Sequence, residues 1–183
     1  MRAYHIDRRK ILQPGDVVTI TPLSNIHIPS DIQKELDTFF PDGLSFHGVQ
    51  YFSKETDPDN AAAVVFETIY EYHRRVFFPA SISRMQSLFA CPDKDSVRKW
   101  VEKLNLKKGS YTVFEIDTLD SVTEEHDAAL VAGGSLDQLS YFSSLHTSSW
   151  ASDYWNSDTA NELPELLISP SFQVIKICSI SSS

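Results

Sequence analysis

The segment Glu162-Leu163-Pro164-Glu165-Leu166-Leu167-Ile168 limits the possible folds more than any other part of the sequence. Pro164 cannot lie in the centre of a sheet, and three branched apolar residues follow Glu165. We therefore expect Glu165 to be the last residue before a buried strand. A carboxylate at the lip of such a strand is partly desolvated and rigidly held, which suits binding a sugar hydroxyl or taking a proton. The alternative is an exposed glutamate that starts a strand.

The rest of the chain predicts short strands with helices inserted between them. Strands are predicted from β-branched and alternating apolar residues at 2–7, 17–20, 49–53, 111–116, 165–168 and 172–178. Helices are predicted from apolar spacing at 62–77, which Pro79 ends, and at 97–104. Ser30 can cap a further helix that Pro41 ends, and residues 136–155 are predicted to be partly helical. The acidic stretch 117–134 does not favour either a helix or a strand. Because strands and helices do not strictly alternate, we predict an α+β fold.

Length and cysteine content indicate one cytoplasmic domain. The chain has 183 residues, enough for a single core, so we predict one domain over 1–180 and a disordered tail at 181–183. No apolar run reaches the length of a membrane span, so no membrane association is expected. Cys91 and Cys178 form no CxxC pair, which favours a reducing compartment. Cys91 lies beside Pro92, and we predict that it is a structural cysteine rather than a reactive one.

The formal net charge of −9 argues against a large nucleic-acid footprint, which needs clustered Lys and Arg. Two basic clusters could still form a local patch, or could simply be solvated faces. They contain Arg8 and Arg9 in one case and Arg74 and Arg75 in the other. The common dinucleotide, phosphate-loop, zinc-protease and nucleophile-elbow motifs are absent, and the histidines lack metal-ligand spacing. The side chains that remain as candidates for a functional site are carboxylates, His, Tyr and Arg, and no metal is expected.

Four short motifs follow one another along the chain. They are Tyr4-His5-Ile6 with Leu12-Gln13-Pro14-Gly15-Asp16, Val49-Gln50-Tyr51-Phe52-Ser53 with Asn60-Ala61-Ala62-Ala63, Ser83-Arg84-Met85-Gln86-Ser87-Leu88-Phe89, and Glu165-Leu166-Leu167-Ile168 with Val174-Ile175-Lys176-Ile177. Their order resembles the ADP-ribosyltransferase superfamily, especially small prokaryotic members of the toxin and phage-defence kind. The first two are similar to motifs of rifamycin-modifying transferases, and the last to the catalytic strand of DNA-targeting bacterial members. The third looks like a signature of a little-studied bacterial family associated with this superfamily.

The resemblance implies a split β-sandwich of two small sheets with NAD, the co-substrate, in the cleft between them. Glu165 would bind the 2′-hydroxyl of the nicotinamide ribose and stabilise the oxocarbenium-like charge that develops as nicotinamide leaves. Glu115 is the second candidate for this role. His5 would hydrogen-bond a ribose hydroxyl. Tyr51 would stack on the nicotinamide ring, with Ser53 of the same motif also in the NAD site.

Arg84 would pair with the NAD pyrophosphate, because a guanidinium matches phosphate oxygens, and Ser83 and Gln86 could add hydrogen bonds. Each assignment has a structural alternative. The histidine could be satisfied by backbone, the tyrosine could belong to the core, and Arg84 could tie its loop to Glu67 or Glu71.

The function implied is a mono-ADP-ribosyltransferase that cleaves NAD and modifies a macromolecule, either RNA, DNA or protein. A toxin of an antiviral or toxin–antitoxin system, with an antitoxin partner, is the implied setting. Leu163 departs from the Glu or Gln that selects acceptors in many relatives, so arginine-directed transfer is not expected. Arg8, Arg9, Arg74 and Arg75 would hold a nucleic-acid acceptor. The alternatives are a non-catalytic binding module of the same fold and an NAD glycohydrolase.

Overall fold

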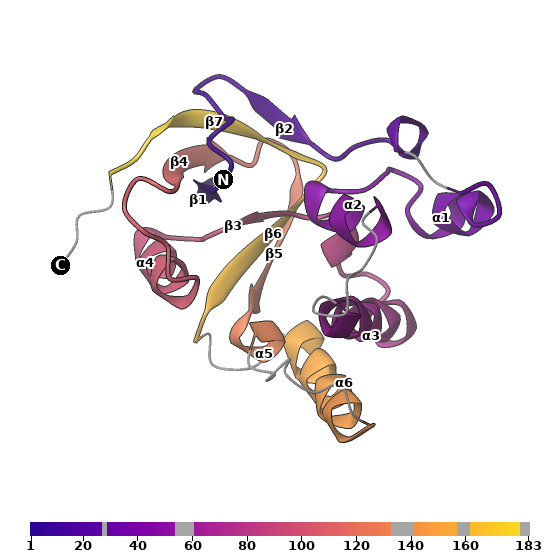
Figure 1. Cartoon of the computed structure of the whole chain (residues 1–183). Helices are drawn as coiled ribbons and strands as arrows, with labels where there is room; N and C mark the ends of the chain where they lie inside the picture. The colour runs from indigo at the N-terminus through magenta and orange to yellow at the C-terminus, as the bar shows by residue number, and fades with distance from the viewer. Residues whose placement is uncertain (27–28, 54–60, 133–140, 157–161, 180–183) are drawn as a thin grey trace.

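Two antiparallel sheets organise the computed structural model, which describes residues 1–26, 29–53, 61–132, 141–156 and 162–179 (Figure 1). The four-stranded sheet has the order β1-β4-β7-β2 and consists of β1 (Arg2–Asp7), β4 (Thr112–Asp117), β7 (Ser171–Ile177) and β2 (Val17–Thr19). The three-stranded sheet has the order β3-β6-β5 and consists of β3 (Leu88–Ala90), β6 (Pro164–Ser169) and β5 (Val122–Asp127). The predicted α+β class is confirmed. The tail at 181–183 lies outside the described residues.

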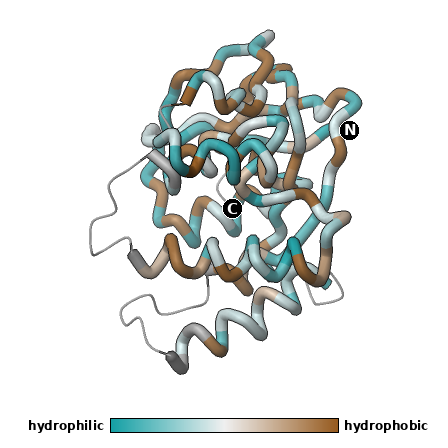
Figure 2. The backbone as a smooth tube through the Cα atoms, turned by 90° about the vertical axis from the view of Figure 1, so that its right-hand side faces the viewer, coloured by the Kyte–Doolittle hydropathy of each residue, from teal (hydrophilic) through white to brown (hydrophobic). Residues whose placement is uncertain are grey.

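The helices lie on both sides of these sheets. They are α1 (Gln33–Phe39), α2 (Phe46–Ser53), α3 (Ala61–Phe77), α4 (Lys94–Lys103), α5 (Ala129–Ala132) and α6 (Tyr141–Asn156), with short 3₁₀ turns η1 (Leu23–Asn25) and η2 (Arg84–Gln86). In Figure 1, α4 lies beside β1 and β3, whereas α3 and α6 pack together on the other side of β6. No described helix is long and apolar enough to cross a membrane, and hydropathy changes repeatedly along the helices in Figure 2.

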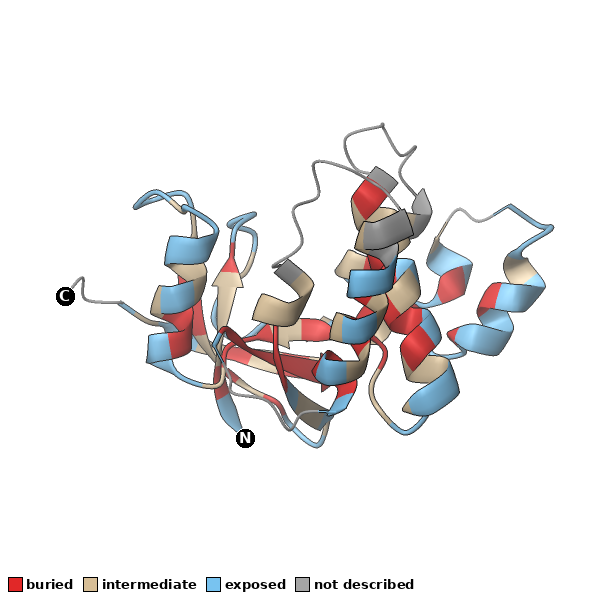
Figure 3. Ribbon diagram, turned by 90° about the horizontal axis from the view of Figure 1, so that it is seen from below, coloured by how far each residue is buried: buried red, intermediate tan, exposed pale blue. Residues whose placement is uncertain are grey.

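A shared apolar core joins the two sheets. The four-stranded sheet contributes Ala3, Phe114, Ile116, Phe172 and Val174, and the three-stranded sheet contributes Leu88, Ala90, Leu166 and Ile168. Tyr4 and Cys91 add a direct connection, because their backbone groups exchange hydrogen bonds of 2.9 and 2.7 Å. Figure 3 shows buried residues concentrated on the strands, with exposed residues on the outer faces of the helices. The core therefore holds β1 and β3 in fixed relative positions.

Strand β6 lies at the centre of its sheet, between β3 and β5, and is buried on both faces. Leu166 and Ile168 point into the core shared by the sheets, whereas Leu167 packs with Tyr70 and Tyr154 under α3 and α6. The predicted strand at 165–168 is found, and Glu165, expected at its lip, is the second residue of β6 and pairs with His126 of β5. A proline is tolerated as the first residue of a strand, so Pro164 does not exclude this position.

Residues 49–53 belong to helix α2, so the predicted strand is wrong. Ser45 explains the difference, because its hydroxyl accepts a hydrogen bond of 3.2 Å from the Gly48 backbone, as an N-cap residue does. Gly48 also permits close packing of α2 on η2, since a Cβ there would lie 2.3 Å from the Met85 carbonyl oxygen. The cap and this packing outweigh the alternating apolar pattern of the segment. The predicted Ser30 cap is also not found, because α1 begins after Ile32.

Candidate functional site

A cavity of about 350 Å³ lies where the two sheets meet α2 and α4. Its charged and histidine lining residues are His5, Asp7, Arg8, Arg9, His47, Arg84 and Glu165. Its aromatic lining residues are Phe46, Phe89, Trp100 and Phe172. These side chains come from β1, α2, η2, β3, α4, β6 and β7 and the loop after β1. The cavity thus combines a mostly apolar wall with a few polar groups, as ligand sites generally do.

Glu165 is a buried carboxylate at the inner end of this cavity, with a side chain that is 3% exposed. Its Oε1 accepts a hydrogen bond of 2.7 Å from the Tyr154 hydroxyl and another from Nη1 of Arg84. Within the described part of the chain, Oε2 has no hydrogen-bond partner. One oxygen is therefore fixed by the protein, and the other is left for a ligand.

Arg84 joins two buried carboxylates. Its Nε and Nη2 each donate a hydrogen bond of 3.1 Å to Glu67, and its Nη1 donates to Glu165 and, at 2.8 Å, to the Tyr154 hydroxyl. Burial alone would lower the pKa of Arg84, but Glu165 and Glu67 outweigh it and hold that pKa well above its ordinary value. The structural alternative, an arginine that ties its loop to Glu67, is therefore what the structure contains. Little of this guanidinium remains for a pyrophosphate.

The neighbours of Arg84 are also engaged in the protein interior. The Ser83 hydroxyl donates a hydrogen bond of 2.8 Å to Glu71. It also accepts a hydrogen bond from the Met85 backbone N–H, so that Ser83 caps η2. The Gln86 side-chain amide donates a hydrogen bond of 3.0 Å to the Gly43 carbonyl oxygen. These contacts explain the polar character of the segment, which fixes a tight turn rather than supplying free donors to the cavity.

His47 was not identified from the sequence, although it lines the cavity and contacts the same network. Its Nε2 lies 3.2 Å from Glu67 Oε1, without the alignment of a hydrogen bond. Burial would raise the pKa of Glu67, but Arg84 and His47 outweigh it and keep that pKa well below its ordinary value. The Ser45 cap is the signal that could have placed His47 in the first turn of a helix.

Tyr51 and Ser53 do not occupy the positions expected of them. Tyr51 is on α2, packs against the cluster around Leu44 and Met85, and contacts the His47 ring at 4.9 Å. It is not among the residues that line the cavity. The aromatic ring that lines the cavity beside His47 is Phe89, at 4.8 Å between centroids. Ser53 ends α2, and its side chain lies outside what the structure describes.

His5 lies on β1 with one ring nitrogen held by the protein. Its Nδ1 is 2.8 Å from the carbonyl oxygen of Phe89, and because a carbonyl only accepts, Nδ1 carries the proton. Burial lowers the pKa of His5, although the Phe89 bond and the charge of Asp7 act in the opposite direction. The imidazole is therefore neutral near pH 7, and its Nε2 presents a lone pair. The structural alternative is therefore found, because the backbone satisfies one nitrogen, and the residue also lines the cavity.

The four arginines assigned to an acceptor do not form one surface. Arg8 and Arg9 are exposed and line the cavity. Arg74 and Arg75 instead bind Glu71, at 2.8 and 2.9 Å. Arg75 also covers the Phe39 ring at 3.8 Å. The α3 pair is thus largely committed to contacts within the protein.

Two further candidates have structural roles. Glu115, the second choice for the catalytic carboxylate, pairs with Lys176 at 3.2 Å and does not line the cavity. Burial raises the pKa of Cys91 to about 12, so its thiol stays protonated, in agreement with a structural cysteine. In the described ranges, His, Cys, Asp and Glu side chains form no group of three or more that could hold a metal ion.

The fold and the site define an α+β protein with two antiparallel sheets and a buried Glu–Arg–Glu network beside a cavity. A family model described as "Protein of unknown function (DUF2441)" matches residues 3–180, and the chain therefore belongs to this family. No curated protein matches the chain.

Proposed function

We propose that the chain is a mono-ADP-ribosyltransferase that binds NAD in the cavity, cleaves its bond between nicotinamide and ribose, and transfers ADP-ribose to a macromolecule. One observation carries the proposal. Glu165 is buried at the cavity with Oε1 fixed by Arg84 and Tyr154, so that Oε2 is available to a substrate. The split β-sandwich proposed for the fold is supported by two antiparallel sheets that share one core.

The charge at the inner end of the cavity suits this chemistry. One guanidinium, Arg84, lies between two carboxylates, Glu67 and Glu165, which leaves one negative charge in excess. The nicotinamide ring of NAD is cationic, and positive charge develops on the ribose as the ring leaves. A preorganised carboxylate beside that developing charge stabilises the transition state more than the ground state.

His5 and Phe89 supply complementary contacts. The lone pair on Nε2 of His5 can accept a hydrogen bond from a ribose hydroxyl, because Nδ1 is the donor to Phe89. The Phe89 ring lines the cavity and can stack on the nicotinamide ring, the role that the resemblance implies for Tyr51. The macromolecular acceptor and the toxin or defence setting stay predictions from the resemblance.

The substitution Glu165→Gln tests the proposal. Glutamine is nearly isosteric, and its carbonyl oxygen can still accept from Arg84 and Tyr154, so the fold and NAD affinity should be retained. Nicotinamide release should fall by roughly 10²–10³, the scale seen for one preorganised electrostatic group. Glu115→Gln is the matched control, since it removes a carboxylate of the neighbouring sheet outside the cavity, and it should release nicotinamide at the wild-type rate.

The same assay identifies the acceptor when NAD carries a label on its adenosine half. RNA, DNA and cell protein are added separately, and the fraction that gains the label contains the acceptor. Release of nicotinamide with free labelled ADP-ribose in every case would indicate a glycohydrolase. No release from folded wild-type protein would contradict the enzyme and favour the binding module.

A further inference from the structure

The loop that follows β1 is held in a single shape by one buried side chain. The Asp7 carboxylate accepts hydrogen bonds of 2.9–3.0 Å from the backbone N–H groups of residues 9, 10, 11 and 12. Burial would raise the pKa of Asp7, but these four bonds outweigh it and lower that pKa. Asp7 is only 3% exposed. These four bonds hold the loop in one shape where it borders the cavity, and Asp7 keeps its negative charge.

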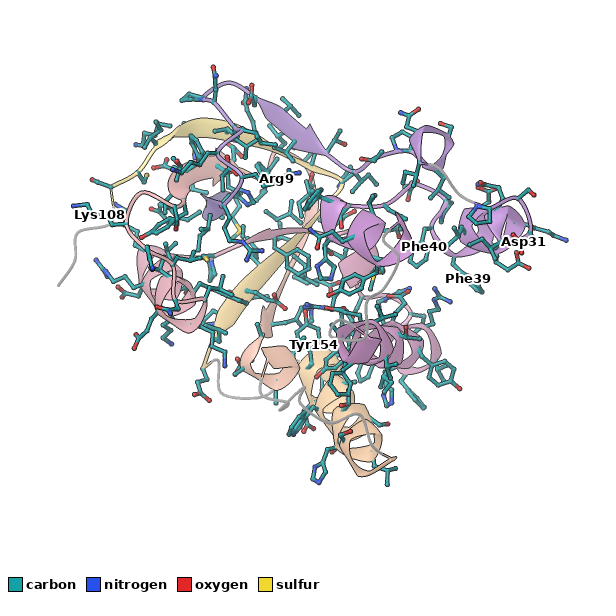
Figure 4. The ribbon with its side chains drawn as sticks, in the orientation of Figure 1. Arg9, Asp31, Phe39, Phe40, Lys108 and Tyr154 are labelled. Carbon is teal, nitrogen blue, oxygen red and sulfur yellow. The ribbon has the colours of Figure 1, made fainter. Side chains whose placement is uncertain are left out.

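This loop places two arginines at the open end of the cavity. Arg8 and Arg9 line the cavity and are exposed, whereas Glu165 at the other end is buried. Arg9 covers the half-exposed ring of Phe46 at 3.8 Å, which restrains its guanidinium without neutralising it. Among the described residues, neither arginine has a carboxylate within ion-pair distance. In Figure 4, Arg9 lies beside the loop after β1, and Tyr154 lies on the opposite side of β3 in that view.

The cavity is therefore polarised along its length. At its inner end Arg84 lies between Glu165, which lines the cavity, and Glu67 behind it, so negative charge is in excess there. At its open end the guanidinium groups of Arg8 and Arg9 outnumber the one carboxylate that lines the cavity with them, Asp7, so positive charge is in excess. A ligand with a cationic end and an anionic middle matches this arrangement in only one orientation. NAD has a cationic nicotinamide ring and a diphosphate with two negative charges.

We propose that Arg8 and Arg9, on the loop organised by Asp7, form the subsite for the diphosphate of the dinucleotide, with the nicotinamide end directed toward Glu165. This inference rests on the proposed function and changes the role of these arginines from acceptor binding to NAD binding. It also replaces Arg84, whose donors are occupied by Glu67, Glu165 and Tyr154. A guanidinium fork fits phosphate oxygens, and a preformed loop reduces the entropy lost on binding.

The test measures binding of ADP-ribose, which carries the diphosphate but lacks the bond to nicotinamide that the enzyme would cleave. The double variant Arg8→Gln, Arg9→Gln removes two exposed charges and leaves the backbone N–H groups that Asp7 binds. By titration calorimetry, its Kd for ADP-ribose should rise roughly 10–100-fold, and the salt dependence of binding should become weaker. Inorganic pyrophosphate should lose affinity in the same variant, whereas nicotinamide should bind unchanged.

The matched control is Arg2→Gln, Lys176→Gln. It removes the same number of positive charges from exposed positions on the four-stranded sheet, away from the residues that line the cavity. Its Kd for ADP-ribose should stay within about twofold of wild type, because screened charges outside the site contribute little. An equal loss in both double variants would overturn the subsite in favour of a general effect of net charge.

The outcomes separate this inference from the proposed function. Weak ADP-ribose binding in Arg8→Gln, Arg9→Gln, from a protein that never releases nicotinamide, would support the subsite and refute the enzyme. Normal ADP-ribose binding and an unchanged KM for NAD, from a protein that does release nicotinamide, would refute the subsite alone. If the only loss were in binding an RNA or DNA oligonucleotide, the arginines would hold acceptor phosphates, and the diphosphate assignment would be wrong.

Discussion

Arg84 and Glu67 form a bidentate ion pair in which Nε and Nη2 of the guanidinium lie 3.1 Å from separate oxygens of the carboxylate. Both side chains are buried, at 6% and 7% exposure. Because two parallel bonds fix the plane of the guanidinium, they also fix where its third nitrogen, Nη1, points. That nitrogen binds Glu165. Glu67 therefore positions Glu165 through Arg84.

Replacement of this arginine should destabilise the protein strongly. Arg84→Met leaves Glu67 and Glu165 buried without a cation, and we expect the free energy of unfolding to fall by about 3–5 kcal/mol. Urea unfolding at pH 7 measures this. Arg75→Met is the comparison, because the Arg75–Glu71 pair is more exposed and should cost about 0–1 kcal/mol. Similar losses in both variants would contradict the buried network.

Glu67 should make stability depend on pH. Its folded-state pKa lies below the ordinary value of 4.5, so the unfolded chain binds more protons on acidification. The stabilisation is complete above pH 4.5 and is lost as the pH falls below it. Glu67→Gln should be less stable at pH 7, yet lose less stability than wild type between about pH 5 and about pH 3. Parallel urea midpoints for the two proteins over that range would disprove the assignment.

Two substitutions of His5 should distinguish the roles of its two ring nitrogens. Asn carries an amide N–H near the Nδ1 position and can keep the bond to the Phe89 carbonyl, whereas Gln places its amide near Nε2. His5→Asn should stay near wild-type stability but lose NAD affinity. His5→Gln should cost roughly 1–3 kcal/mol, since a buried carbonyl loses its donor, and retain more NAD affinity than His5→Asn. Thermal unfolding and NAD titration decide, and the reverse order of affinities would refute the proton assignment.

The hydroxyl of Tyr154 should matter for turnover as well as for folding. Tyr154→Phe removes the donor to Glu165 Oε1, and Tyr70→Phe removes a similar buried donor, whose acceptor is the Leu130 carbonyl. Each should lower stability by about 1–2 kcal/mol. Only Tyr154→Phe should also lower kcat for nicotinamide release, by roughly tenfold, with KM little changed. Equal kcat values in the two variants would make Tyr154 purely structural.

Strong local patterns made several elements predictable. The apolar run at Leu166–Ile168 and the helical spacing over residues 62–77 each favour one structure, and β6 and α3 are found there. The alternation at 49–53 was misleading because the Ser45 cap and the contact between Gly48 and Met85 decide that segment. Local patterns fail to predict the secondary structure where a short segment fits both a strand and a helix and a distant contact decides between them.

Strand β5 was missed because its sequence, VTEEHD, has few apolar residues. Its polar groups are satisfied by partners far along the chain, such as the backbone N–H groups of 162 and 163 that bind Asp127. The site shows the same limit. Glu165 and His5 follow from motifs, and Glu67 was named as a possible partner of Arg84, but the role of His47 depends on packing that no local pattern encodes.

The position of β7 has a consequence for how the protein is made. β7 lies between β4 and β2, and β2 has no other neighbour in its sheet. A ribosome-bound chain translated as far as residue 170 therefore carries β2 with unpaired edges, and its four-stranded sheet lacks the strand that joins β4 to β2. The cavity can close only after Phe172 has emerged. Premature release before that point would leave the cavity without Phe172, the part of its wall that β7 supplies.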